Sequence, residues 1–255
     1  MVLNRPVFFQ AVNIVAFIVT ITVNMLAGST TLLNGVTSAE VSDMYPTLVT
    51  PAGFTFSIWG IIYMLLLLFI VYQALPKNRD QPFLGQIGLL FALSGACNIS
   101  WLFLWHYKMV TYSLILMFAL LATLIWIYLR LGIGRVAVSL KEMVLVHLPF
   151  SVYLGWISIA TIANMSVALT AIGWDGWGIE PVTWAVVIIC VALLLSLAML
   201  VTRKDIAYSF VVVWALVGIL EKQSEYQNIV LASEIGIVLL LVAIGVTVAG
   251  SRLKR

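Results

Sequence analysis

The chain has 255 residues, of which 63% are hydrophobic and 9% are charged, and its formal net charge is +3. A soluble domain usually carries about 25% charged residues, so this composition excludes a chain made mainly of soluble domains and indicates that most of its length lies in a lipid bilayer. The basic residues form short clusters between apolar runs, as in proteins oriented in a membrane. They do not indicate a nucleic-acid partner.

Apolar runs of about 20 residues, the length that crosses a bilayer, recur along the chain. The first run, 7–27, is too long for the core of a signal peptide and contains Gln10, Asn13 and Asn24, so it predicts a retained helix. Turn-forming segments separate the later runs. We expect an all-α, polytopic membrane bundle of about eight transmembrane helices, at 6–27, 53–75, 84–105, 110–130, 142–168, 181–202, 206–221 and 228–250.

The distribution of Lys and Arg predicts how this bundle is oriented. With eight spans, 11 of the 13 basic residues fall on one side, including Arg252, Lys254 and Arg255, and only Lys108 and Lys222 fall on the other. Because basic loops stay in the cytoplasm, we expect an integral protein of the cell's inner or plasma membrane with both termini cytoplasmic. The longest loop, 28–52, contains no Lys or Arg and would lie outside.

Polar and aromatic residues recur every three or four positions in four of the helices, which places them on one face of each. These stripes are Gln10, Asn13, Phe17, Thr20 and Asn24; Phe56, Trp59 and Tyr63; Ser94, Asn98, Trp101 and Trp105; and Tyr153, Trp156, Ala160 and Asn164. Polar groups avoid lipid, so the stripes should face the bundle interior, either as interhelical hydrogen bonds or as a pocket for a flat hydrophobic ligand. Trp105 and His106, next to Lys108, are interpreted as interfacial residues.

Three segments resemble one known family, the tryptophan-rich sensory protein or translocator protein (TspO/MBR) family. "LVTPAGFTFSIWGIIYMLL" is similar to its first-loop and second-helix signature, "ACNISWLFLW" to its third-helix Asn-x-x-Trp, and "YLGWISIATIAN" to its fifth helix. Two departures stand out. Thr50 occupies the place of a second loop proline, and Pro149 lies about one turn earlier than the proline of the family.

The resemblance implies a five-helix bundle over 1–170 whose pocket is roofed by the first loop, followed by an additional three-helix membrane segment over 171–255. It implies ligands such as porphyrins, haem-related tetrapyrroles or sterol-like molecules, with haem or porphyrin as a ligand and no required cofactor. Together the family positions and the stripes give nine candidate ligand-binding residues: Pro51, Trp59, Tyr63, Asn98, Trp101, Tyr153, Trp156, Ala160 and Asn164. The three extra helices would cover a face that smaller members use to dimerise, so the oligomeric state, homodimer included, stays open.

Three functions remain open from the sequence: a receptor or sensor for a flat hydrophobic ligand, a secondary transporter, and a tetrapyrrole-modifying enzyme. Glu234 is an acid within the last apolar run and therefore a functional candidate for transport; the alternative is that it reaches the interface or pairs with Lys222. The sequence contains no phosphate loop, metal-binding cluster or nucleophile motif. We therefore expect no metal and favour a non-enzymatic role.

Overall fold

The computed structural model describes residues 5–29 and 33–252, and the regular structure within these ranges is helical. Its eight long helices are α1 (Arg5–Ser29), α3 (Ile58–Ala74), α5 (Leu90–His106), α6 (Val110–Arg130), α8 (Leu148–Ala171), α9 (Pro181–Arg203), α10 (Ile206–Lys222) and α11 (Gln227–Arg252). Short helices are α2 (Ser38–Asp43), α4 (Pro82–Ile87) and α7 (Leu140–Glu142), and tighter or wider turns are η1 (Gly53–Ser57), η2 (Pro76–Asn78), η3 (Met143–His147) and η4 (Gly176–Gly178). The predicted class, a polytopic helical membrane bundle, is confirmed.

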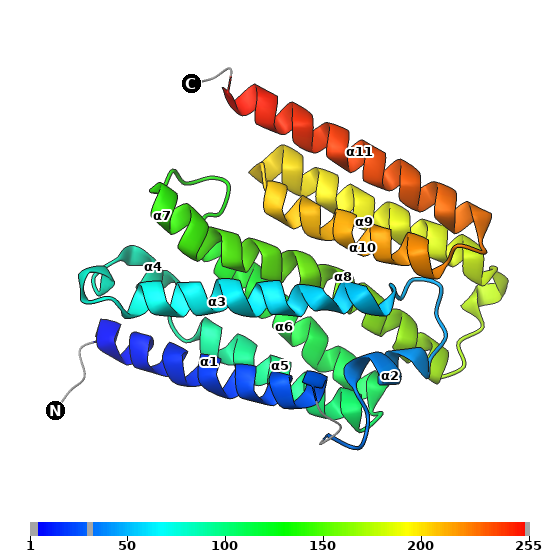
Figure 1. Cartoon of the computed structure of the whole chain (residues 1–255), viewed down its shortest axis with the longest axis horizontal. Coiled ribbons are helices and arrows are strands. Elements are labelled where there is room, and N and C mark those ends of the chain that lie inside the picture. The colour runs from blue at the N-terminus through cyan, green and yellow to red at the C-terminus, as the bar shows by residue number, and fades with distance from the viewer. Residues whose placement is uncertain (1–4, 30–32, 253–255) are drawn as a thin grey trace.

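Six helical stretches are long and apolar enough to cross a membrane, in the part of the chain that the structure describes. They are α1, α3 together with η1, α6, α8 together with α7 and η3, α9 and α11. The other two long helices, α5 and α10, have 17 residues each, which is near the lower limit of about 17 for a span. α1 begins and α11 ends at the same end of the bundle (Figure 1). Lys254 and Arg255, used in the predicted charge distribution, lie outside the described residues.

One of the expected helices is wrong, and another contains a wider turn. The segment 84–105 is not one helix, because α4 ends at Ile87 and α5 begins at Leu90. Gly88 between them has φ +51°, a conformation that a glycine adopts at little cost. The fifth predicted helix, 142–168, contains the π-helical turn η3 directly before α8. Pro149 lacks a backbone N–H and its ring crowds the preceding turn, and a wider turn accommodates it.

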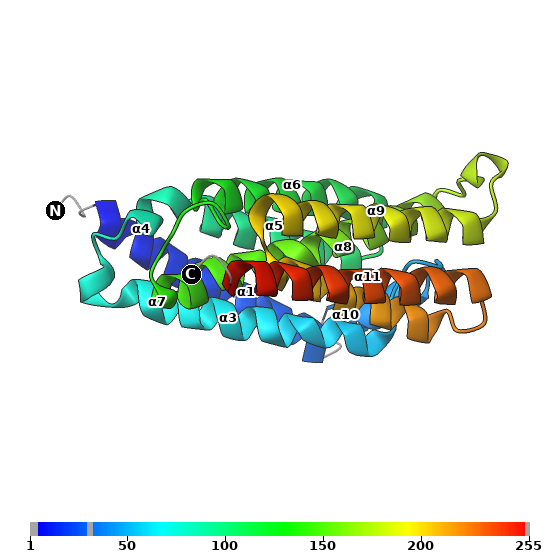
Figure 2. The ribbon, with the colours of Figure 1, turned by 90° about the horizontal axis from the view of Figure 1, so that it is seen from above.

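Helix α8 lies at the centre of the bundle and packs against α3, α6 and α10. On one side α5 joins α6 to α1, and on the other α9 packs against α10 and α11. Figure 2 shows α6 and α9 along the same face of the molecule. Gly155 permits a close approach of α8 to α10, since a Cβ there would lie 3.1 Å from Val211 and 3.3 Å from the Tyr208 carbonyl oxygen.

The polar stripe of α1 is used for hydrogen bonds between helices. Asn13 donates to the Gln73 side chain at 3.0 Å, and Gln10 donates to the Gln73 carbonyl, which ties α1 to the end of α3. Asn24 donates to Asn98 Oδ1 at 2.6 Å, which ties α1 to α5. Of the two interpretations of this stripe, the structure supports interhelical hydrogen bonding.

The final three helices contact the rest of the bundle mainly through α10, which packs against α8 and η1. The expected boundary at residue 170 coincides with the end of α8 at Ala171. The division into a domain over 1–170 and a segment over 171–255 stays a prediction.

Candidate ligand-binding cavity

One enclosed cavity of about 50 Å³ lies between the helices beneath the segment that joins α1 to α3. We call it the roofed cavity, and its roof is α2 with residues 44–52. Its walls come from η1, α5, α6 and α8. The lining residues are Ser38, Ser42, Thr50, Pro51, Phe56, Trp101, Trp105, Met117, Trp156, Ile159, Ala160, Ala163, Asn164 and Val167. The lining is mainly apolar and aromatic, with hydroxyl and amide groups at a few points.

Five of the nine candidate residues, which come from three separate segments of the chain, line this cavity: Pro51, Trp101, Trp156, Ala160 and Asn164. Spacing on α8 explains the last three, because positions 156, 160 and 164 follow one helical face. The same face also brings Ala163 and Val167 to the cavity.

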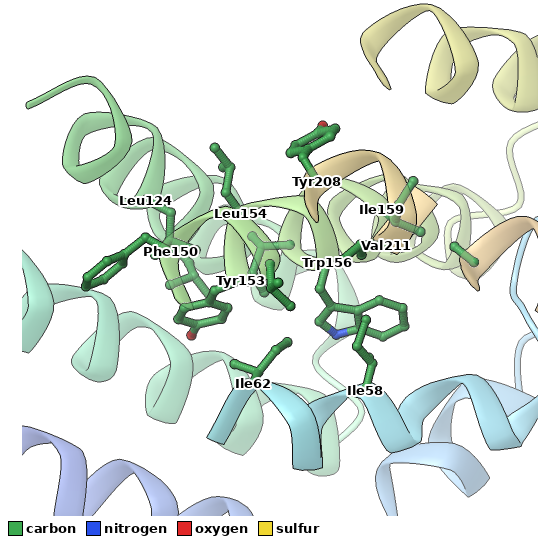
Figure 3. Packing of buried hydrophobic residues seen from close by; sticks show 14 of the residues in the cluster. Ile58, Ile62, Leu124, Phe150, Tyr153, Leu154, Trp156, Ile159, Tyr208 and Val211 are labelled. Carbon is green, nitrogen blue, oxygen red and sulfur yellow. The ribbon is translucent and has the colours of Figure 1, made fainter. Parts of the chain in front are cut away.

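The remaining four candidates lie beside the cavity, not in its lining. Trp59 stacks on Tyr63 with ring centroids 5.6 Å apart, and it meets the rings of Tyr153 and Trp156 edge to face at 6.0 and 6.3 Å. Trp59 is therefore half-buried against α8 and does not project freely into lipid. Figure 3 shows Trp156 and Tyr153 reaching from α8 towards α3. Asn98 is fully buried and accepts the hydrogen bond from Asn24.

Two interpretations of the third helix are wrong. Trp105 is not an interfacial residue, because it is buried, lines the cavity and stacks on Trp101 with centroids 5.7 Å apart. Its indole nitrogen donates to the Ser38 carbonyl at 3.2 Å, which attaches it to the roof. His106 is fully buried and its Nδ1 lies 2.9 Å from the Leu102 carbonyl oxygen. The four-residue spacing from Trp101 to Trp105 places the two indoles on one face of the helix, and this spacing could have indicated that Trp105 faces the bundle interior.

Asn164 orients the aromatic wall of the cavity. Its Oδ1 accepts a hydrogen bond from the Trp101 indole nitrogen at 2.9 Å, and its amide nitrogen donates to Ser113 Oγ at 3.2 Å. The amide thus fixes the Trp101 ring between α5 and α8. By contrast, the Trp156 indole nitrogen is buried and has no hydrogen-bond partner within the described residues, so a donor beside the cavity is free.

Helix α10 holds the roof from outside the cavity. Ala52 donates its backbone N–H to the Gly218 carbonyl at 2.9 Å, and the Trp214 indole nitrogen donates to the Thr55 carbonyl at 2.9 Å. Phe54 meets the Trp214 ring edge to face at 5.4 Å. A Cβ at Gly218 would overlap the Thr55 hydroxyl, so only glycine permits this close approach.

Two contacts at the C-terminal end of α10 extend this attachment to the rest of the roof. Lys222 Nζ lies 2.8 Å from the Asp43 carboxylate, and Gln223 Nε2 donates to the Thr47 carbonyl at 3.3 Å. Lys222 therefore pairs with Asp43 at the end of α2. Glu234, the intramembrane acid candidate, is exposed on α11 and lines neither this cavity nor the larger groove described below.

These features define a class of protein: a polytopic helical membrane protein with an enclosed aromatic cavity between its helices and a structured loop as its roof. The family follows from sequence comparison. A family model described as TSPO-like protein matches residues 10–246, and the chain belongs to that family. The match extends through α9 and α10 and most of α11. Comparison with curated proteins and with solved structures gives no match.

Proposed function

We propose that this TspO-type membrane protein is a receptor or sensor that binds a flat hydrophobic ligand, namely a porphyrin, a haem-related tetrapyrrole or a sterol-like molecule, between its helices. One observation carries the proposal: Pro51, Trp101, Trp156, Ala160 and Asn164, from three separate segments, surround the same enclosed cavity. Ligand sites are concave and mostly apolar with a few placed polar groups. Indole rings stack on flat ligands and their N–H groups donate to polar edges.

Ligand binding requires the roof to move. The cavity measures about 50 Å³, whereas sites for drug-sized ligands are roughly 300–1,000 Å³. The present conformation is therefore the closed form, and a tetrapyrrole binds a form in which α2 and residues 44–52 are displaced from α5 and α8. A ligand that binds only the open form shifts the population towards it.

The residues around the cavity take different parts in this proposal. Trp101 and Trp156 supply faces for stacking, and the free Trp156 N–H supplies a hydrogen bond to a ligand acceptor. Asn164 acts through Trp101, whose ring it holds by the 2.9 Å hydrogen bond. Ala160 lines the cavity, so a larger side chain there would occupy the space in which the ligand binds.

Titration of the protein with protoporphyrin IX in lipid nanodiscs tests the site, with binding followed by the porphyrin's own fluorescence. We expect Trp59→Ala/Trp156→Ala and Ala160→Leu each to weaken binding at least tenfold. Ala11→Leu is the matched control, because Ala11 is exposed on α1 and should leave binding unchanged. Equal affinity in the wild type and the double variant would exclude this site.

Two further measurements separate a receptor from the alternative functions. Porphyrin flux in proteoliposomes that depends on a proton gradient and stops in Glu234→Gln would indicate a transporter. Conversion of the porphyrin into a new product, with or without light, would indicate an enzyme. The proposal expects neither flux nor conversion, only saturable binding.

We also propose that the protein lies in the inner or plasma membrane with both termini in the cytoplasm, which places the roof outside. The support is the distribution of Lys and Arg, with only Lys108 and Lys222 of 13 basic residues on the roof side. Labelling of an Asp43→Cys variant in intact cells with a membrane-impermeant maleimide tests this orientation. Labelling only after the cells are broken would contradict it.

A further inference from the structure

A second cavity of about 1160 Å³ runs along the outside of the bundle between α6, α8 and α9, and Pro46, Thr47, Leu48 and Val49 of the roof and Tyr208 of α10 also line it. We call it the lateral groove. One face of α9 lines it from Pro181 to Arg203, the whole length of that helix. At about 1.5 Å per residue, the 23 residues of α9 span roughly the 30 Å of a bilayer's hydrocarbon core. The groove therefore extends from one membrane surface to the other.

The wall of the lateral groove offers almost no unused hydrogen-bonding group. Six Ser and Thr residues line it, and five of them donate to the carbonyl four residues earlier in their own helix: Ser158, Thr161, Ser166, Thr170 and Thr202. The hydroxyl of the sixth, Thr47, is hydrogen-bonded to that of Thr50. Between these residues lie large apolar side chains such as Phe118, Ile125 and Leu195, which remain 40–45% exposed. A partner helix would lack hydrogen-bonding groups to engage, whereas a hydrocarbon chain needs none.

The two ends of the groove differ in chemistry. At one end Trp174, Trp177 and Trp184 pack together with ring centroids 5.3–5.9 Å apart, as in aromatic belts at membrane interfaces. At the other end is Arg203, whose Cζ lies 5.6 Å from the Tyr128 ring. The groove is thus aromatic and uncharged at one surface, apart from Asp175, and cationic at the other.

Arg203 keeps hydrogen-bonding capacity for an anion. Its guanidinium donates to the Ile133 carbonyl at 3.3 Å, and no carboxylate of the described residues lies within ion-pair distance. The nearby Asp205 carboxylate is occupied, because it accepts from Tyr128, Ser151 and the backbone N–H of Tyr208. A guanidinium presents five N–H donors in a planar fork that fits phosphate oxygens.

We propose that the lateral groove binds an anionic phospholipid, with the headgroup phosphate at Arg203 and the acyl chains along α6, α8 and α9. The basic end supplies the charge complementarity that distinguishes such a lipid from a zwitterionic one, and the apolar wall accommodates its chains. This site lies on another face of α8 than the roofed cavity, and the roof residues Pro46, Thr47, Leu48 and Val49 line it only at the end away from Arg203. The proposal does not depend on the proposed function.

The test compares phosphatidylglycerol with phosphatidylcholine of identical acyl chains, each titrated into delipidated protein in detergent. Bound lipid is counted by native mass spectrometry, and the thermal unfolding midpoint is recorded. We expect phosphatidylglycerol to remain bound and to raise the midpoint at concentrations at least tenfold lower than phosphatidylcholine. Equal effects of the two lipids on the wild type would overturn the proposal, without the need for any variant.

Two pairs of variants locate the site. Arg203→Gln should abolish the preference for phosphatidylglycerol, whereas Lys204→Gln, which removes an adjacent charge outside the groove, should retain it. Ala198→Trp should reduce bound lipid at least tenfold because Ala198 lines the groove, whereas Leu194→Trp, on a face of α9 outside it, should not. A preference that persists in Arg203→Gln would contradict the proposal. A dimer that forms without lipid and that Ala198→Trp dissociates would also contradict the proposal, because a second copy of the chain would then fill the groove.

Discussion

The roofed cavity and the lateral groove lie on opposite faces of the same helix, α8, yet one is small and the other is large. Trp156, Ala160 and Asn164 face the cavity of about 50 Å³. Ser158, Ile162 and Met165 face the groove of about 1160 Å³. The difference does not come from α8 itself. It comes from what packs over each face.

Over the cavity, α10 holds a short helix and its loop through one backbone hydrogen bond and an ion pair, and holds the adjoining η1 through an indole hydrogen bond. Over the groove, α9 turns instead to α10 and α11. If both proposals hold, a ligand reaches the cavity only after roof contacts break, whereas a lipid reaches the groove by replacing another lipid. Binding to the cavity should therefore respond to changes at the C-terminal half of α10, which holds the roof, whereas headgroup binding at Arg203 should not.

The largest effect on stability is expected from Asp205→Ala. This buried carboxylate joins α6 through Tyr128, α8 through Ser151, and the N-terminus of α10 through the Tyr208 backbone N–H. Its removal leaves buried hydroxyls without an acceptor and takes away a helix cap, a loss of about 3 kcal/mol or more. Thermal unfolding in detergent micelles measures it.

The control for this change lies at the opposite end of the groove. Asp175 also caps a turn, with its carboxylate accepting from the Trp177 backbone N–H at 2.9 Å, but it is exposed. Asp175→Ala should cost no more than about 1 kcal/mol. Equal losses in the two variants would mean that Asp205 does not hold the groove's basic end together.

The next largest effect on stability is expected from Gly218→Ala, which should change binding to the roofed cavity but not the lipid preference of the lateral groove. The added methyl group overlaps the Thr55 hydroxyl and comes within 2.9 Å of Pro51 Cβ, so α10 and the roof must move apart. We expect a loss of about 1–3 kcal/mol, typical of overpacking, together with faster porphyrin binding and an unchanged preference for phosphatidylglycerol, which is set at Arg203. Stopped-flow fluorescence measures the porphyrin rate.

Two control variants test whether the effect of Gly218→Ala comes from its contact with the roof. Thr55→Ala/Gly218→Ala removes the overlapping hydroxyl and should recover much of the stability. Gly245→Ala on α11 has open space around its Cβ and should be neutral or slightly stabilising. If Gly218→Ala changes the stability and the rate of porphyrin binding no more than Gly245→Ala does, the roof is not held by α10.

Much of the cavity wall could be predicted from sequence because its residues follow helical spacing inside recognisable segments. Trp156, Ala160 and Asn164 share one face of α8, and Trp101 follows Asn98 by three positions. Trp105 was predicted wrongly because a tryptophan near a Lys and a Tyr has the composition of an interfacial belt. Only the packing of α2 over it shows that it is buried.

The roof attachment and the lateral groove could not be predicted in the same way. Trp214 bonds to the carbonyl of Thr55, 159 positions away, and no local pattern links the two segments. The groove is harder still, because helix surfaces that face lipid and those that face protein are both apolar in a membrane. The sequence of α9 is hydrophobic on all sides, so periodicity does not tell which face is left uncovered.

A smaller effect is expected at the rim of the roof. The Lys222–Asp43 pair is partly exposed, with side chains 31% and 67% accessible, and exposed pairs contribute about 0.2–1 kcal/mol. Lys222→Gln should therefore speed porphyrin binding by no more than about fivefold. Added salt should reproduce this gain in the wild type but not in the variant. A larger gain from Lys222→Gln than from Gly218→Ala would place the main attachment at the rim.

The smallest effect concerns the first turn of α2. Glu40 accepts a hydrogen bond from the Thr37 backbone N–H at 2.6 Å, with a second from the Thr37 hydroxyl, and this capping box lowers the pKa of the Glu40 carboxyl. A carboxyl whose pKa is lower in the folded state stabilises that state above the unfolded pKa, and the contribution is lost as pH falls through the folded pKa.

Amide exchange in α2, measured from pH 7 to 3, should therefore rise relative to that in α10 at the acid end. Glu40→Gln removes the titrating group, so its α2 protection should show little of this acid-dependent change. Identical acid profiles in the wild type and Glu40→Gln would mean that the capping box does not order the roof, and that its closure rests on α10 alone.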